Sequence, residues 1–246
     1  MKALILAAGY ATRLYPLTLE TPKPLLEVCG KTIMQRIMEK AVESGIVEEF
    51  IVVSNSRFYK KFEDFFKNYS PGVPVRLLND GSLSNDDRLG AVADINFALK
   101  QAGYFGDLLL LAGDIIFDFS IKPMVESFLE EKREILALFD VKSLALAKRF
   151  GIAQLDREKR IDSFIEKPEN PKSTLASTAF YILGEKALSM IPEFLETSGK
   201  KDAIGFLFEW LLGKGVILYG FEFNEGKWFD IGSLESLESA RKHFQH

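Results

Sequence analysis

The first 120 residues alternate between short apolar runs and longer segments with helical periodicity. Short continuous apolar runs indicate buried strands, whereas apolar residues spaced three and four apart indicate amphipathic helices. A regular alternation of the two predicts a parallel α/β sheet with helices on both faces. The expected strands are residues 2–7, 48–55, 73–80 and 107–114, and the expected helices are 32–45, 59–69 and 90–103.

The rhythm changes after about residue 134, because several further strands follow one another without a helix between them. This arrangement predicts a mixed sheet in the second half. We find no internal repeat, low-complexity tract or flexible linker, so we expect one continuous domain over residues 1–246. The expected strands here are 134–141, 151–156, 160–168, 177–183 and 216–223, with helices near 185–195, 203–213 and 234–244.

Composition excludes several classes of protein. The net charge of -4 argues against a broad nucleic-acid-binding surface, and no apolar run is long enough to span a membrane. Cys29 is the single cysteine, which rules out an internal disulfide and fits a cytoplasmic location. His243 and His246 are the only histidines, both at the end of the chain. Catalysis by this chain would therefore depend on carboxylates, lysine and arginine.

The stretch LILAAGYATRLYPLT, residues 4–18, places small residues directly after the first expected strand. Ligands of open α/β sheets bind beyond the carboxyl ends of strands, so this loop is a candidate binding site. It is not a P-loop, because no G-x-x-x-x-G-K-[ST] run exists. It is not a dinucleotide fingerprint either, since Ala11 and Leu14 follow Gly9 where further glycines would be needed.

Two basic residues accompany this loop. Arg13 follows it directly, and Lys23 lies between two prolines that stiffen its segment. Backbone N–H groups in a tight turn, together with one arginine and one lysine, can bind a polyphosphate. A turn that merely carries surface charges would show the same pattern.

Carboxylates at two distant positions are candidates for metal binding. Asp114 ends an expected strand, and Asp230 lies in the segment WFDIGS. Each could be a turn or capping residue, or the two could meet over Mg²⁺, which binds one or two carboxylates together with phosphate oxygens. In the segment EKP, the proline predicts an extended Lys167, which would point Glu166 and Lys167 to opposite faces rather than into a simple ion pair.

These motifs together resemble the sugar-phosphate nucleotidyltransferase family. That family typically has a G-x-G-T-R-L loop followed by P-K-P-L-L, and here Ala11 replaces the second glycine. An alanine there predicts a negative φ or a slightly reshaped loop. The resemblance covers nearly the whole chain, through LAAGYATRLYPLT, TPKPLLEVCGKTI, LLAGDIIF, RFGIAQLD, FIEKPENP, STAFYIL and GKWFDIGSLES.

The resemblance implies a Rossmann-like three-layer α/β/α nucleotidyltransferase fold with a mixed, mostly parallel sheet. Residues 1–120 would form the nucleotide-binding half and residues 121–246 the sugar-phosphate-binding half. The implied catalytic residues are Arg13 and Lys23, and Asp114 and Asp230 would hold Mg²⁺. Sugar phosphate would contact Gly151, Glu166 and Lys167. Nucleotide would contact Leu6, Ala7, Ala8, Gly9, Ala11, Thr12, Arg13, Lys23, Asn79, Gly81 and Gly90.

The implied reaction converts a nucleoside triphosphate and a sugar 1-phosphate into a nucleoside diphosphate sugar and pyrophosphate. It needs no histidine, because a phosphate monoester with a second pKa of about 6 is already mostly ionised at pH 7. One alternative is a cytidylyltransferase that acts on inositol 1-phosphate or phosphocholine. Another is a catalytically inactive regulator that binds nucleotide.

The resemblance also implies partners and boundaries. We expect small-molecule substrates and a possible homo-oligomer, without nucleic acid or membrane partners. The chain ends at His246, which predicts that the C-terminal left-handed β-helix of longer relatives is missing.

Overall fold

Strand β1 (Lys2–Leu6) lies inside the main sheet of the computed structural model, which describes residues 1–245. It is parallel to its two neighbours, β4 (Glu49–Ser54) and β6 (Leu108–Ala112), and β5 (Val75–Asn79) continues the parallel arrangement beyond β4. Strands of a parallel sheet that is covered on both faces are apolar throughout, which explains their short continuous runs. The predicted parallel first half is confirmed.

Strand β11 (Leu175–Leu183) joins the second half to the first by running antiparallel to β6. It also pairs antiparallel with β8 (Glu134–Asp140) and β9 (Gly151–Leu155), and β10 (Ile161–Glu166) forms the edge beyond β9. Strand β12 (Leu218–Phe223) is parallel to β8. The predicted mixed sheet is therefore confirmed.

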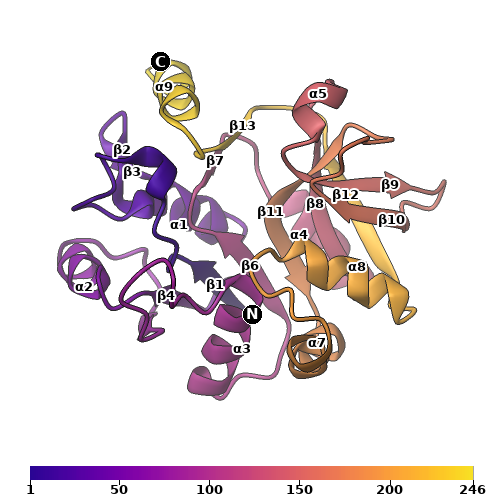
Figure 1. Ribbon diagram of the computed structural model, residues 1–246, viewed down its shortest axis with the longest axis horizontal. Coiled ribbons are helices and arrows are strands. Elements are labelled where there is room, and N and C mark those ends of the chain that lie inside the picture. Colours follow the sequence, from indigo (N-terminus) through magenta and orange to yellow (C-terminus); the bar gives the residue numbers. More distant parts are fainter. Residues whose placement is uncertain (246) are drawn as a thin grey trace.

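Helices cover both faces of the sheet, as Figure 1 shows. Side chains alternate along β1, so Ile5 packs in the core on one face and Leu4 in the core on the other. The face of Ile5 is covered by α1 (Ile33–Glu43), α2 (Tyr59–Asn68), α4 (Lys122–Glu131) and α9 (Leu234–His243). The face of Leu4 is covered by α3 (Ala91–Ala102), α6 (Glu185–Ser189), α7 (Ile191–Thr197) and α8 (Gly205–Gly213).

The structure contains several elements that the sequence analysis did not predict. Strand β7 (Ile115–Phe117) pairs antiparallel with β13 (Trp228–Asp230), and β2 (Glu27–Val28) pairs with β3 (Lys31–Thr32). Helix α4 and the single-turn α5 (Leu144–Ala147) also had no predicted counterpart. The expected helix near residues 185–195 is split into α6 and α7. Within residues 1–245, every helix falls short of the length and apolarity that a membrane span requires.

Candidate active site

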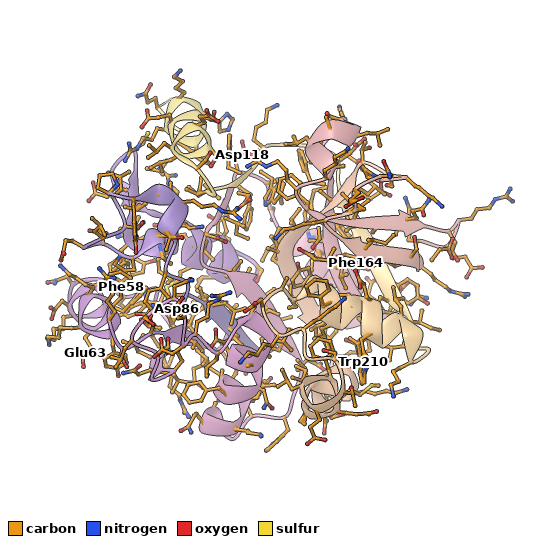
Figure 2. All side chains as sticks on the ribbon, in the orientation of Figure 1. Phe58, Glu63, Asp86, Asp118, Phe164 and Trp210 are labelled. Carbon is orange, nitrogen blue, oxygen red and sulfur yellow. The ribbon has the colours of Figure 1, made fainter. Side chains whose placement is uncertain are left out.

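A cavity of about 510 Å³ lies at the carboxyl ends of β1 and β6, and segments from both halves of the chain form its wall. In Figure 2, Phe58 and Asp86 mark the half that contains β1, and Phe164 marks the half that contains β10. Open α/β sheets bind their ligands beyond the carboxyl ends of the strands, and the cavity lies at this position. Of the predicted site residues, the wall contains Leu6, Ala7, Ala8, Gly9, Ala11, Thr12, Arg13, Lys23, Gly90, Asp114, Gly151, Glu166, Lys167 and Asp230.

Asn79 and Gly81 lie off this wall, so the structure does not bring them to the cavity. The side-chain oxygen of Asn79 accepts hydrogen bonds from the Ser56 hydroxyl at 2.9 Å and from the Gly81 N–H at 3.0 Å. Gly81 has a φ of +87°, as a turn of this kind requires. Asn79 ends β5, and Gly81 lies in the turn that follows it.

Two side-chain hydrogen bonds to backbone carbonyls hold the loop after β1 in place. The side-chain N–H₂ of Asn55 donates to the Ala8 carbonyl at 2.8 Å, and the Thr18 hydroxyl donates to the Ala11 carbonyl at 2.8 Å. A Cβ added to Gly9 would meet no protein atom within 4 Å. Ala11 has a φ of +49°, so it does not have the negative φ that was one of the two predictions for this alanine. The alanine instead adopts the left-handed conformation that glycine accommodates more readily.

Lys23 and Asp114 form an ion pair across the cavity wall. Lys23 begins a 3₁₀ turn (Lys23–Leu25) directly after Pro22, and its Nζ lies 2.7 Å from Oδ2 of Asp114. A Cβ added to Gly113, just before Asp114, would lie 2.7 Å from the Leu6 carbonyl oxygen. Gly113 therefore lies close to the backbone at the end of β1, which positions the adjacent Asp114.

Asp230 reaches Asp114 through the short β7–β13 pairing. In this register Asp230 is opposite Ile115, and the Ile231 N–H donates to the Asp114 carbonyl at 2.9 Å. Burial, and then the negative charge of Asp114, raise the pKa of Asp230, while Lys23 and Arg149 act in the opposite direction. Two carboxylates that are far apart in the sequence thus share one site that favours an added cation.

The second group of site residues comes from β9 and β10. A Cβ added to Gly151 would lie 2.5 Å from the Phe164 ring and 2.9 Å from Oε2 of Glu166, so a side chain there would displace these groups. Burial raises the pKa of Glu166, and the charge of Lys167 partly offsets the rise. The backbone N–H of Glu166 donates to the Glu209 carboxylate at 2.7 Å.

The expectation of an extended Lys167 is wrong. Its φ is +50°, because its N–H bonds to the Phe150 carbonyl at 3.0 Å and turns the chain after β10. Consequently the Lys167 ammonium lies 3.6 Å from Oε1 of Glu166, and the two side chains form an ion pair. The local preference imposed by the following proline is weaker than this long-range backbone bond.

Sequence reasoning missed several groups on the cavity wall, including Arg149, Asp94 and Gly205. Arg149 precedes Gly151 by two residues and adds a further positive charge near Asp230. Asp94 is a carboxylate within the apolar pattern of α3, which is a readable signal for a buried polar group. Gly205 begins α8 where a Cβ would lie 2.0 Å from Oε2 of Glu166, a contact that only the fold reveals.

His243 is not among the residues that line this wall. His243 packs beside Phe229 and its Nε2 lies 2.6 Å from Oδ2 of Asp118, away from the residues that line the cavity. His246 lies outside the described residues.

A divalent cation of the Mg²⁺ type fits the donor set of Asp114 and Asp230. Both are oxygen ligands, they are adjacent through the β7–β13 register, and the negative charge of one disfavours ionisation of the other. The remaining ligands of such a cation would be phosphate oxygens and water.

An α/β fold of this kind, with a small-residue loop, paired carboxylates and basic residues around one cavity, defines a nucleotide-handling protein. The chain belongs to the nucleotidyl transferase family, whose sequence model matches residues 2–246. It is 32% identical over 99% of its length to the bifunctional protein GlmU of Methanocaldococcus jannaschii, of which it covers 54%. It is 28% identical over 98% of its length to a UTP–glucose-1-phosphate uridylyltransferase of Synechocystis, of which it covers 62%.

The chain therefore spans between about half and two thirds of the length of these curated relatives. Among solved structures, a Bacillus anthracis protein assigned as a glucose-1-phosphate thymidylyltransferase, in complex with sucrose, superimposes with a TM-score of 0.85. It is 27% identical, and the match covers 99% of this chain and 94% of the other. A UDP-glucose pyrophosphorylase complexed with UDP-glucose, 22% identical, shares the fold with a TM-score of 0.82 over 99% of this chain and 97% of that one.

Proposed function

We propose that this chain transfers a nucleotidyl group from a nucleoside triphosphate to a sugar 1-phosphate and releases pyrophosphate. The observation that carries the proposal is the meeting of Lys23, Asp114, Lys167 and Asp230 around one cavity. These residues come from distant parts of the chain, and together they supply the opposite charges that a metal–triphosphate complex and a second phosphate need.

The chemical step is an in-line displacement at the α-phosphorus. An oxygen of the acceptor phosphate forms a bond to the α-phosphorus, the bond from that phosphorus to the bridging oxygen of the β-phosphate breaks, and its electron pair leaves with pyrophosphate. The attacking oxygen is already ionised near pH 7, so no general base is required. The protein must position the two substrates and neutralise the negative charge of the transition state.

Lys23 is the residue that acts on the triphosphate where charge develops. Its ammonium is already aligned, because it lies 2.7 Å from Oδ2 of Asp114 and follows a rigid proline. Arg13, exposed on the wall beyond the small-residue loop, would bind the outer phosphates that leave. The backbone around Gly9 would lie against the nucleotide.

Asp114 and Asp230 would hold Mg²⁺. When bound, the cation neutralises phosphate charge and orients the triphosphate. The chain's own contribution is to keep the two carboxylates adjacent through the β7–β13 pairing, with Lys23 and Arg149 reducing the cost of their ionisation.

Lys167 and Glu166 would bind the acceptor. The Lys167 side chain is more than half exposed at the cavity, so its ammonium is available to a phosphate, and Glu166 would accept a hydrogen bond from a sugar hydroxyl. Close packing around Gly151 and Gly205 holds the Glu166 carboxylate in place.

A pyrophosphate-release assay with Mg²⁺ tests this function. The matrix would combine ATP, GTP, CTP, UTP and dTTP with the 1-phosphates of glucose and mannose, inositol 1-phosphate and phosphocholine. We expect release that depends on both substrates and is greatest with a sugar 1-phosphate. Preference for inositol 1-phosphate or phosphocholine would favour the cytidylyltransferase alternative. Tight nucleotide binding without release from any pair would contradict the proposal and favour an inactive regulator.

A further inference from the structure

Asp94 is a buried carboxyl group in the cavity wall that the reaction outlined above does not use. It lies one turn after Gly90, at the start of α3, and its backbone N–H donates to the Gly90 carbonyl at 2.8 Å. The residue is only 6% exposed, yet it lines the cavity. Its side chain therefore faces both the protein interior and the space where a ligand would bind.

The Asp94 carboxyl lacks a hydrogen-bond partner within the described part of the chain. Its Oδ1 is fully buried and unpaired there. A buried polar group without a partner destabilises the folded protein, so such groups are uncommon in native structures. A ligand with an N–H group in the cavity would supply the missing donor to this carboxyl group.

The neighbours of Asp94 place it at the nucleotide end of the cavity. The charges that act on it are those of Asp80, which follows β5, and Lys201, which precedes α8. Lys201 lies beside the start of α3, because the Val92 N–H donates to the Lys201 carbonyl at 3.1 Å. The acceptor residues Glu166 and Lys167 come from β10 and the turn after it.

Gly90 packs closely against the segment that precedes α8. A Cβ added to Gly90 would lie 2.8 Å from the Lys201 carbonyl oxygen, so the segment before α8 closes the wall there.

The chemistry of a carboxylate distinguishes the pyrimidines. An ionised carboxylate only accepts hydrogen bonds, and cytosine offers its exocyclic N4 amine as a donor. Uracil and thymine carry the O4 carbonyl oxygen at that position, which would repel a carboxylate. We propose that Asp94 is a specificity-determining residue that accepts a hydrogen bond from the exocyclic amine of the base, so that CTP is preferred over UTP and dTTP; this rests on the proposed function.

The protonation state of Asp94 should modulate this preference. Burial and the charge of Asp80 favour the neutral carboxyl and raise its pKa to about 7, while Lys201 favours the ionised form. A neutral carboxyl can also donate to a carbonyl oxygen and would tolerate uracil. The preference for CTP should therefore increase from pH 6 to pH 8.

Equilibrium binding of Mg-CTP and Mg-UTP, measured by titration calorimetry at pH 8, tests the proposal without requiring turnover. We expect the wild-type protein to bind CTP at least about tenfold more tightly than UTP, which corresponds to about 1.4 kcal/mol. In Asp94→Asn the amide both donates and accepts, so the ratio should fall to within about threefold. Asp86→Asn, at an exposed position in the neighbouring loop (Figure 2), should retain the wild-type ratio.

Asp94→Ala is a second variant in case Asp94→Asn fails to fold, and it should also lose the preference for CTP over UTP. Cooperative unfolding of both variants would show that each is folded. Equal or tighter binding of UTP or dTTP by the wild-type protein would overturn the inference, as would an unchanged ratio in either Asp94 variant. Failure to bind any nucleotide would overturn it together with the proposed function. CTP-selective binding without pyrophosphate release would contradict only the proposed function.

Discussion

Lys23 and Lys167 face the cavity from different segments, and their removal should change different kinetic constants. A contact made mainly in the transition state lowers kcat when removed, whereas uniform binding raises KM. A hydrogen bond to a charged group contributes about 1.5–3 kcal/mol, and about 1.4 kcal/mol is tenfold. Lys23→Ala should therefore lower kcat roughly ten- to a hundredfold, and Lys167→Ala should raise KM for the acceptor by a similar factor.

Steady-state kinetics and calorimetry with Mg-NTP and with acceptor would separate the two roles. The exposed Lys172 provides a control, because Lys172→Ala removes the same charge nearby. Loss of nucleotide binding in Lys167→Ala with unchanged acceptor binding would show that the two roles are assigned wrongly.

Asp94 should also give the stability of the protein a distinctive pH dependence. Its pKa is raised from 3.8 to about 7 by burial and Asp80, so the folded state holds this proton more tightly than the unfolded state does. Asp94 therefore destabilises the fold progressively as pH rises from about 4 to about 7, and by a constant amount above that. The positive charge of Lys201 lowers the pKa of Asp94 and so reduces this destabilisation.

Asp94→Asn removes this titration. Its free energy of unfolding relative to wild type should increase between pH 4 and pH 7 and then level off. Urea unfolding at several pH values measures the difference, with Asp86→Asn as a control. A difference in the free energy of unfolding that does not change with pH would contradict the raised pKa of this buried carboxyl.

At the scale of elements, the contact between α8 and β10 fixes the acceptor side of the cavity. Gly205 begins α8, and a Cβ there would lie 2.0 Å from Oε2 of Glu166 and 2.9 Å from the Phe164 ring. Gly205→Ala should displace the Glu166 carboxylate and raise KM for the acceptor by about tenfold, the effect of losing one hydrogen bond to a charged group.

Gly213, at the end of the same helix, is the matched control. A Cβ there would meet no atom within 4 Å, so Gly213→Ala should leave both Michaelis constants unchanged. Equal effects of the two substitutions on acceptor KM would indicate a general change in α8 rather than a local displacement of Glu166.

The short β7–β13 pairing could not be predicted from the sequence. The carboxylates Asp114 and Asp230 are visible as candidates because each follows an apolar segment, but three-residue strands have no periodicity that a sequence reveals. The regular strands and helices of the first half were predictable, because burial on both faces imposes long apolar runs. The turn at Lys167 was not, since a distant carbonyl of Phe150 overrides the local effect of proline.

At the scale of the whole molecule, the cavity combines segments from both halves of the chain, and the carboxylate pair joins them. Asp114→Asn should reduce activity at least a hundredfold while the fold survives, because the cation would lose a charged ligand. Thermal unfolding and pyrophosphate release measure the two effects. Full turnover of the variant, or of the wild-type protein in excess EDTA, would contradict the metal-binding role.

The fate of the acceptor's phosphate oxygens tests the central claim most directly. A sugar 1-phosphate labelled with ¹⁸O in its non-bridging oxygens would be incubated with Mg-NTP, and the products analysed by mass spectrometry. The proposed attack on the α-phosphorus predicts that all of the label is retained in the nucleoside diphosphate sugar and that pyrophosphate is unlabelled. Label in pyrophosphate, or release of unlabelled nucleoside monophosphate without a sugar nucleotide, would contradict nucleotidyl transfer to the sugar phosphate.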